Sequence, residues 1–95
     1  IEQIGDDNLA SITQDGAPSS IAEIKQTGDD NEASIAQSGA GNEAYITQIG
    51  SQNLAAIDQS GVQGYAFIQQ NGIGHHASIT QTGGSGNSAT IYQSN

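Results

Sequence analysis

Apolar and polar side chains alternate along this chain in short runs that recur about every eleven residues. In the run Ala33-Ser34-Ile35-Ala36-Gln37, the Ala, Ile and Gln lie two residues apart, and a Gly follows two residues after the Gln. A spacing of two places all three side chains on one face of a β-strand, whereas a helix would scatter them. Each run therefore predicts one short strand.

The run occurs nine times, and a fixed period of this kind predicts a stack of equivalent units. We expect one repeat domain, residues 1–95, of nine strand-turn units at 1–8, 9–20, 21–31, 32–42, 43–53, 54–64, 65–75, 76–87 and 88–95. The predicted core consists of Ile1, Ile12, Ile24, Ile35, Ile46, Ile57, Ile68, Ile79 and Ile91 with Ala10, Ala22, Ala33, Ala44, Ala55, Ala66, Ala77 and Ala89. The third inward position is Gln3, Gln14, Gln26, Gln37, Gln48, Gln59, Gln70, Gln81 and Gln93.

Turn-forming residues separate the predicted strands. Gly, Asn, Asp and Ser fill most positions between each Gln and the next Ala, and these residues favour tight turns. A Gly two residues after the Gln supplies a positive φ or a corner without a side chain. The predicted turn glycines are Gly5, Gly16, Gly28, Gly39, Gly50, Gly61, Gly72 and Gly83, and the recurrent turn amides are Asn8, Asn31, Asn42, Asn53 and Asn87.

Two consecutive strands could form a hairpin, but turns of about four residues and identical inward faces favour another arrangement. If the two strands of a 22-residue pair face each other, their Ile and Ala side chains meet in a thin core. The next pair then stacks on the first at a spacing of ~4.8 Å. The pattern thus predicts an all-β, two-sheet β-solenoid of about four and a half coils, which becomes cross-β when stacked into a fibre.

Composition alone would favour disorder, because only 34% of the residues are hydrophobic. The periodicity overturns that interpretation, and the charges agree with it: none of the ten acids, nor Lys25, lies at an Ala, Ile or Gln position. A slip of one residue in strand pairing would bury those charges. A net charge of −9 disfavours nucleic acid and anionic lipid as partners. The chain has no Cys, which excludes disulfides, and no apolar run of membrane-spanning length.

Two contacts are expected between outward side chains one coil apart. Tyr45 and Phe67 share an outward position, so their rings should stack on the sheet surface. Glu2 and Lys25 share another, which predicts an exposed ion pair of little energetic value.

Four carboxylates are the candidates for a cation site. The turns with Asp6-Asp7 and Asp29-Asp30 should stack, and oxygen-rich acidic loops suit Ca²⁺ or respond to pH. The alternative is four solvated carboxylates that merely repel, and no calcium-binding repeat motif accompanies them.

The two adjacent histidines have no further ligands at their level, and His75 occupies an Asn position. No nucleophile triad, phosphate loop or paired-carboxylate motif stands apart from the repeat, so we expect neither an enzyme nor a cofactor.

The repeated amides are the best candidates for functional residues. Buried amides must be hydrogen-bonded, and identical amides stacked at the strand spacing bond each coil to the next. The alternative, generic polar turn residues, does not explain a Gln in nine units of nine.

The unit Ala-x-Ile-x-Gln-x-Gly-x-x-Asn resembles the curlin repeat of curli fibre subunits, and the resemblance covers essentially the whole chain. It implies a secreted bacterial protein that builds functional amyloid in the biofilm matrix and supports surface adhesion. It also implies export through an outer-membrane pore, polymerisation started by a nucleator subunit at the cell surface, and an inward Gln/Asn ladder.

Open strand edges at both ends of the stack predict that the chain assembles with itself, head to tail. Neither end departs from the repeat or carries a Pro or charge cluster that would block pairing. Nine is an odd number, so a coil that continues into the next copy relates successive copies by about half a turn. Two alternatives are a minor nucleator and a monomeric ice- or glycan-binding solenoid. The irregular outward series Thr13, Ala36, Asp58, Thr80 counts against the latter.

Overall fold

The computed structural model describes residues 1–15 and 19–94. Within them each repeat unit forms one strand, as predicted. The strands are β1 (Glu2–Ile4), β2 (Leu9–Asp15), β3 (Ile21–Asp29), β4 (Glu32–Ala40), β5 (Glu43–Ser51), β6 (Leu54–Val62), β7 (Tyr65–Ile73), β8 (His76–Gln81) and β9 (Ser88–Ser94).

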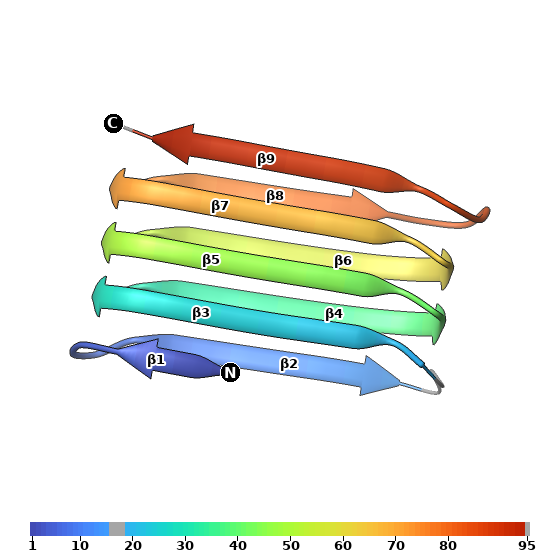
Figure 1. Ribbon diagram of the computed structural model, residues 1–95, viewed down its shortest axis with the longest axis horizontal. Helices are drawn as coiled ribbons and strands as arrows, with labels where there is room; N and C mark the ends of the chain where they lie inside the picture. Colours follow the sequence, from blue (N-terminus) through green and yellow to red (C-terminus); the bar gives the residue numbers. More distant parts are fainter. Residues whose placement is uncertain (16–18, 95) are drawn as a thin grey trace.

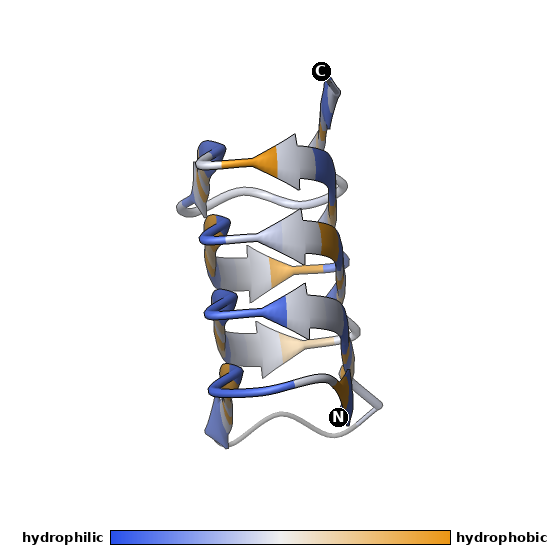
Figure 2. Cartoon of the chain, turned by 90° about the vertical axis from the view of Figure 1, so that its left-hand side faces the viewer, coloured by the Kyte–Doolittle hydropathy of each residue, from blue (hydrophilic) through white to orange (hydrophobic). Residues whose placement is uncertain are grey.

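Successive strands alternate between two sheets, and the strands within each sheet are parallel (Figures 1 and 2). The odd-numbered strands form a sheet in the order β1-β3-β5-β7-β9, and the even-numbered strands form the other in the order β2-β4-β6-β8. The chain winds from one sheet to the other at every turn and climbs along the stack, so its two termini lie at opposite ends. The predicted two-sheet β-solenoid is confirmed.

Each residue of the repeat lies above the same residue of the coil below. Ala33, Ile35 and Gln37 of β4 pair with Ala55, Ile57 and Gln59 of β6, and the other neighbouring strands repeat this register. The inward face is therefore the same in every coil. This register also keeps the acids outside the stack.

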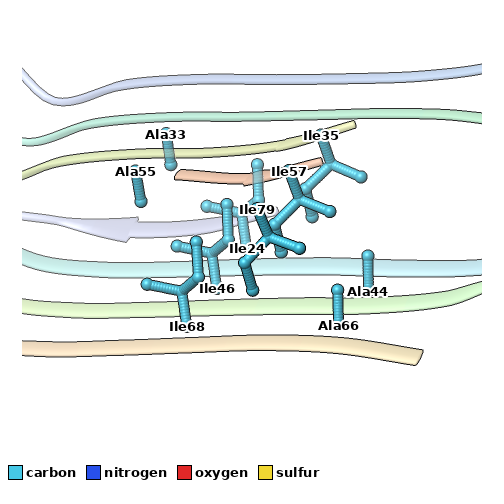
Figure 3. Close-up of a cluster of buried hydrophobic side chains, with 10 residues drawn as sticks. All are labelled: Ile24, Ala33, Ile35, Ala44, Ile46, Ala55, Ile57, Ala66, Ile68 and Ile79. Atoms are coloured by element: carbon cyan, nitrogen blue, oxygen red, sulfur yellow. The ribbon is translucent and has the colours of Figure 1, made fainter. Parts of the chain in front are cut away.

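The core is a single layer of side chains between the two sheets (Figure 3). The strands of one sheet run opposite to those of the other. The Ile side chains of the two sheets therefore meet in the middle, and the alanines lie to either side. The buried members are Ile24, Ala33, Ile35, Ala44, Ile46, Ala55, Ile57, Ala66, Ile68 and Ile79, and Ala10, Ile12, Ala22, Ala77, Ala89 and Ile91 pack against them partly buried. The core prediction is wrong for Ile1, which is 65% exposed, because it lies just before β1, the outermost strand of the odd-numbered sheet.

Most of the repeat glycines lie inside strands, where the sequence pattern predicts turns. Gly28, Gly39, Gly50, Gly61 and Gly72 take φ between +98° and +135°, yet the strands continue through them. Pairing continues because each Gly stacks on the Gly of the next coil, as Gly28 does on Gly50. Gly5 and Gly83 do lie outside the strands, and Gly16 is outside the described residues.

Both predicted surface contacts take different partners. The rings of Tyr45 and Phe67 are register neighbours, but Tyr45 packs with Tyr65 (centroids 6.0 Å apart) and Phe67 with Tyr92 (5.7 Å). These are diagonal pairs, which long aromatic side chains can reach across a sheet. The Lys25 ammonium lies 3.3 Å from the carboxylate of Glu23 in its own strand, so its ion-pair partner is Glu23 and not the predicted Glu2.

Candidate functional site: amide ladders and open strand edges

The glutamines form one continuous ladder in each sheet. In the odd-numbered sheet Nε2 of Gln26 donates to Oε1 of Gln48, and Gln48 donates to Gln70, at 2.8 Å each. The other sheet repeats this from Gln14 through Gln37, Gln59 and Gln81, and Gln3 and Gln93 are the end members of the first ladder. All of these bonds run in the same direction along the stack.

The second amide proton fixes that direction. Nε2 of Gln48 also donates to the backbone carbonyl of Glu32 in the opposite sheet, at 3.0 Å. Only the NH₂ end of an amide can donate to a carbonyl, so this contact decides which end is nitrogen. Glu32 precedes Ala33, so the Gln of one sheet reaches across the core to the chain beside the Ala position of the other. Ala and Gln are therefore complementary parts of one cross-sheet contact.

As a result the two ends of the stack are chemically different. At the N-terminal end Gln3 and Gln14 have Oε1 directed away from the ladder, since their Nε2 atoms donate upward. At the C-terminal end Gln81 and Gln93 donate to the carbonyls of Tyr65 and His76, and, within residues 1–15 and 19–94, to no further glutamine. One end offers acceptors and the other offers donors.

An asparagine column joins the coils at one turn. Oδ1 of Asn31 accepts from the backbone N–H of Asn53 at 3.1 Å, and its Nδ2 donates to the carbonyl of Gly50 at 2.9 Å. Asn8 and Asn53 make the same contacts in their coils. His75 fills the fourth position: its N–H donates to Asn53, while its buried Nε2 has no hydrogen-bond partner in the part of the chain that the structure describes.

The column at the opposite turn is less regular. Oδ1 of Asn42 accepts from the N–H of Gly64 at 2.8 Å, but Gly64 has no amide with which to continue the series. Asn87, at the same position one coil further, is exposed and donates to the carbonyl of Gly83 in its own turn.

The acidic turns stack as expected, but their described side chains do not form a cluster that could bind a cation. The N–H of Asp6 donates to Oδ1 of Asp29 at 3.1 Å, and the N–H of Asp30 donates to the carbonyl of Asp6. Among the residues described, no three His, Cys, Asp or Glu side chains are placed to hold a metal ion. The contacts of Asp29 therefore join coils within the turn.

A segregation of charge along the axis was missed from the sequence, although the positions of the acids show it directly. Asp58 is the last charged residue, and residues 59–95 contain no Asp, Glu, Lys or Arg. Since the chain climbs the stack in order, the N-terminal coils hold the whole net charge and the C-terminal coils are neutral apart from histidine.

Both ends of the stack present strand edges of the same repeat. The outermost strands are β1 and β9 in one sheet and β2 and β8 in the other. β8 and β9 contain no proline and no acid, and their Ile and Gln side chains are aligned with those below. No helix in the described parts of the chain is long and apolar enough to cross a membrane.

The model of the Curlin associated repeat matches the chain three times, at residues 19–50, 28–61 and 50–83. No curated protein and no solved structure matches it. The matches overlap and together span well over half of the chain, and they cover the same units that form strands β3 to β8. The chain therefore belongs to the curlin-repeat family.

Proposed function

We propose that this chain is a structural subunit of an extracellular, curli-like amyloid fibre at the bacterial cell surface, where it builds biofilm matrix and supports adhesion. The family is structural and not enzymatic. The observation that carries the proposal is the pair of open edges, whose inward Ile and Gln side chains are in register with the repeat. An unpaired strand edge of this kind is a template on which another chain can pair.

The direction of the Gln ladders supports head-to-tail stacking. The C-terminal end presents Nε2 donors of Gln81 and Gln93, and the N-terminal end presents Oε1 acceptors of Gln3 and Gln14. If two C-terminal ends were joined, the Nε2 donors of one copy would face the Nε2 donors of the other. Two N-terminal ends would also bring together the acidic halves of two copies, which like charge disfavours. We therefore propose the repeated Gln and Asn amides as the residues that carry assembly.

The odd number of strands supports a half-turn between copies. β9 ends in the odd-numbered sheet, so the next vacant strand position lies over β8 in the other sheet. A copy that continues the coil places its β1 there, and its Gln3 accepts from Gln81 while its Gln14 accepts from Gln93.

Fibre diffraction and negative-stain imaging of the purified chain at neutral pH test the function. We expect long unbranched fibres with a ~4.8 Å meridional and a ~10 Å equatorial reflection. A folded chain that stays monomeric would refute the proposal and favour a binding solenoid. The family resemblance adds a nucleator and an outer-membrane pore as proposed partners, and assembly only as a seed for another subunit would make this chain the nucleator.

Paired cysteines test the half-turn, because the native chain has none. Glu2, Thr80 and Tyr92 share one outward position of the repeat. Half-turn stacking places Glu2 on Thr80 of the copy below, whereas pure translation places it on Tyr92. Neighbouring strands in register bring Cα atoms within disulfide range. We therefore expect oxidised fibres of Glu2→Cys/Thr80→Cys, and not Glu2→Cys/Tyr92→Cys, to give reducible covalent oligomers; the reverse would establish translation.

A further inference from the structure

The outer face of β7 and β9 is uncharged and aromatic. Its outward side chains include Tyr65, Phe67 and Gln69 on β7 and Thr90 and Tyr92 on β9, and these five residues are called the aromatic face below. All other strands apart from β8 carry an acid on their outward side. Three of the four aromatic residues of the chain therefore lie on strands without a charged residue, and the nearest acid is Glu43, the register neighbour of Tyr65 on β5.

The aromatic face is open to solvent although its rings are large. Tyr92 is 70% and Tyr65 is 37% exposed. Tyr92 packs against Phe67 at a centroid distance of 5.7 Å and tilts by 45°, so the rings form a raised surface and not a flat stack. Beside it lies a hollow of about 190 Å³ lined by Gln69, Asn71, Tyr92, Gln93 and Ser94. The face therefore presents a projecting ring with a hollow beside it.

We propose that the aromatic face pairs with the aromatic face of a second copy, side by side, so that solenoids associate laterally as well as end to end. The distribution of charge indicates that this face is the one that can meet a second copy. Two molecules of net charge −9 repel wherever their acids face one another, and of the uncharged outer faces only this one offers large rings. The outer face of β8 presents the small Ser78 and Thr80 with His76.

A two-fold pairing fits the geometry. In such an interface each surface meets its own equivalent, so Tyr92 of one copy enters the hollow beside Tyr92 of the other. Aromatic side chains are enriched and charges are depleted in the centres of protein interfaces. In the proposed head-to-tail stack, β2 of the next copy adds Asp15 at one edge of the face, and Glu43 of β5 lies at the other. The rings of β7 and β9 thus lie between two acidic borders, and Asp15 of the next copy stands over Ser94 at the rim of the hollow.

The variant Gln69→Glu tests this contact with an isosteric change that adds one charge at its centre. Ser34→Glu is the matched control: it adds the same charge to the outer face of β4 in the opposite sheet. We expect wild-type and Ser34→Glu fibres to pair into bundles in electron micrographs at low salt. Gln69→Glu fibres should remain single, with at least a tenfold smaller bundled fraction, and high salt should restore part of it because it screens the added charges.

The outcomes separate this proposal from the fibre function. Single wild-type fibres, or equal bundling of Gln69→Glu and wild type, would overturn the lateral contact and leave the fibre proposal intact. Equal loss in both variants would also overturn it, since net charge alone would then explain the effect. Single wild-type fibres that sediment with an added polysaccharide would replace the second copy with a glycan. If the wild type forms no fibres, sedimentation velocity of the soluble chain decides: a dimer lost in Gln69→Glu supports the contact, and a monomer overturns it.

Discussion

Replacing Gly50 by alanine tests the closest contact between successive coils. Gly50 lies in β5 with φ +121°, and a Cβ added to it would stand 1.9 Å from the carbonyl oxygen of Gly72 in β7. Real Cβ atoms essentially never approach closer than 3.0 Å, so the two strands must separate locally by about 1 Å. The change therefore acts on the stacking itself and not on the hydrophobic core.

The magnitude follows from the bonds that this separation breaks. The carbonyls of Gly50 and Gly72 accept from Asn31 (2.9 Å) and Asn53 (3.0 Å), and both bonds depend on the present strand spacing. Together with one ladder bond they are worth about 3 kcal/mol at ~1 kcal/mol each. A left-handed backbone adds roughly 1–2 kcal/mol for a residue with a Cβ. We expect Gly50→Ala to lower the free energy of unfolding by about 4–5 kcal/mol.

Gly74→Ala is the matched control. Gly74 also has a positive φ, +71°, but a Cβ added to it would meet no atom within 4 Å. The free energy of unfolding of Gly74→Ala should fall only by the backbone contribution of roughly 1–2 kcal/mol. The assay is denaturant unfolding of freshly desalted, soluble chain followed by far-ultraviolet circular dichroism. Equal losses in the two variants would refute the close stacking of glycines, whatever the absolute values.

Two further predictions concern the amides and a tyrosine. Gln48→Met keeps the size of a fully buried side chain but removes its three hydrogen bonds. We expect it to lower the free energy of unfolding by about 3 kcal/mol. Gln3→Met, at the exposed end of the ladder, should lower it by about 1 kcal/mol or less in the same assay. Desolvation and then the Glu43 carboxylate raise the pKa of Tyr45 above its ordinary value of 10.0. The folded chain thus holds the phenol proton more tightly, and stability should fall as pH rises from about 10 through the raised pKa. In an absorbance titration of the folded chain, Glu43→Gln should shift the pKa of this phenol downward, and an unchanged curve would contradict the assigned cause.

The strands, their inward faces and the two-sheet stack could be predicted from the sequence. The reason is that the pattern is local and repeated: Ala33, Ile35 and Gln37 lie on one face of any extended chain, whatever surrounds them. Because the copies are nearly identical, pairing like with like leaves no competing register that would also keep the acids outside. The buried Ile and Gln positions follow from this alone, except at the ends of the stack, where Ile1 is exposed.

Contacts that depend on the second sheet or on a diagonal neighbour were decided only by the tertiary structure. The direction of the Gln ladders depends on Nε2 of Gln48 reaching the carbonyl of Glu32 across the core, which no pattern within one strand contains. The ring of Tyr45 and the ammonium of Lys25 each have several partners of similar energy within reach on an exposed surface. Repetition determines the register of the backbone, but the choice among neighbouring side chains is made by geometry in three dimensions.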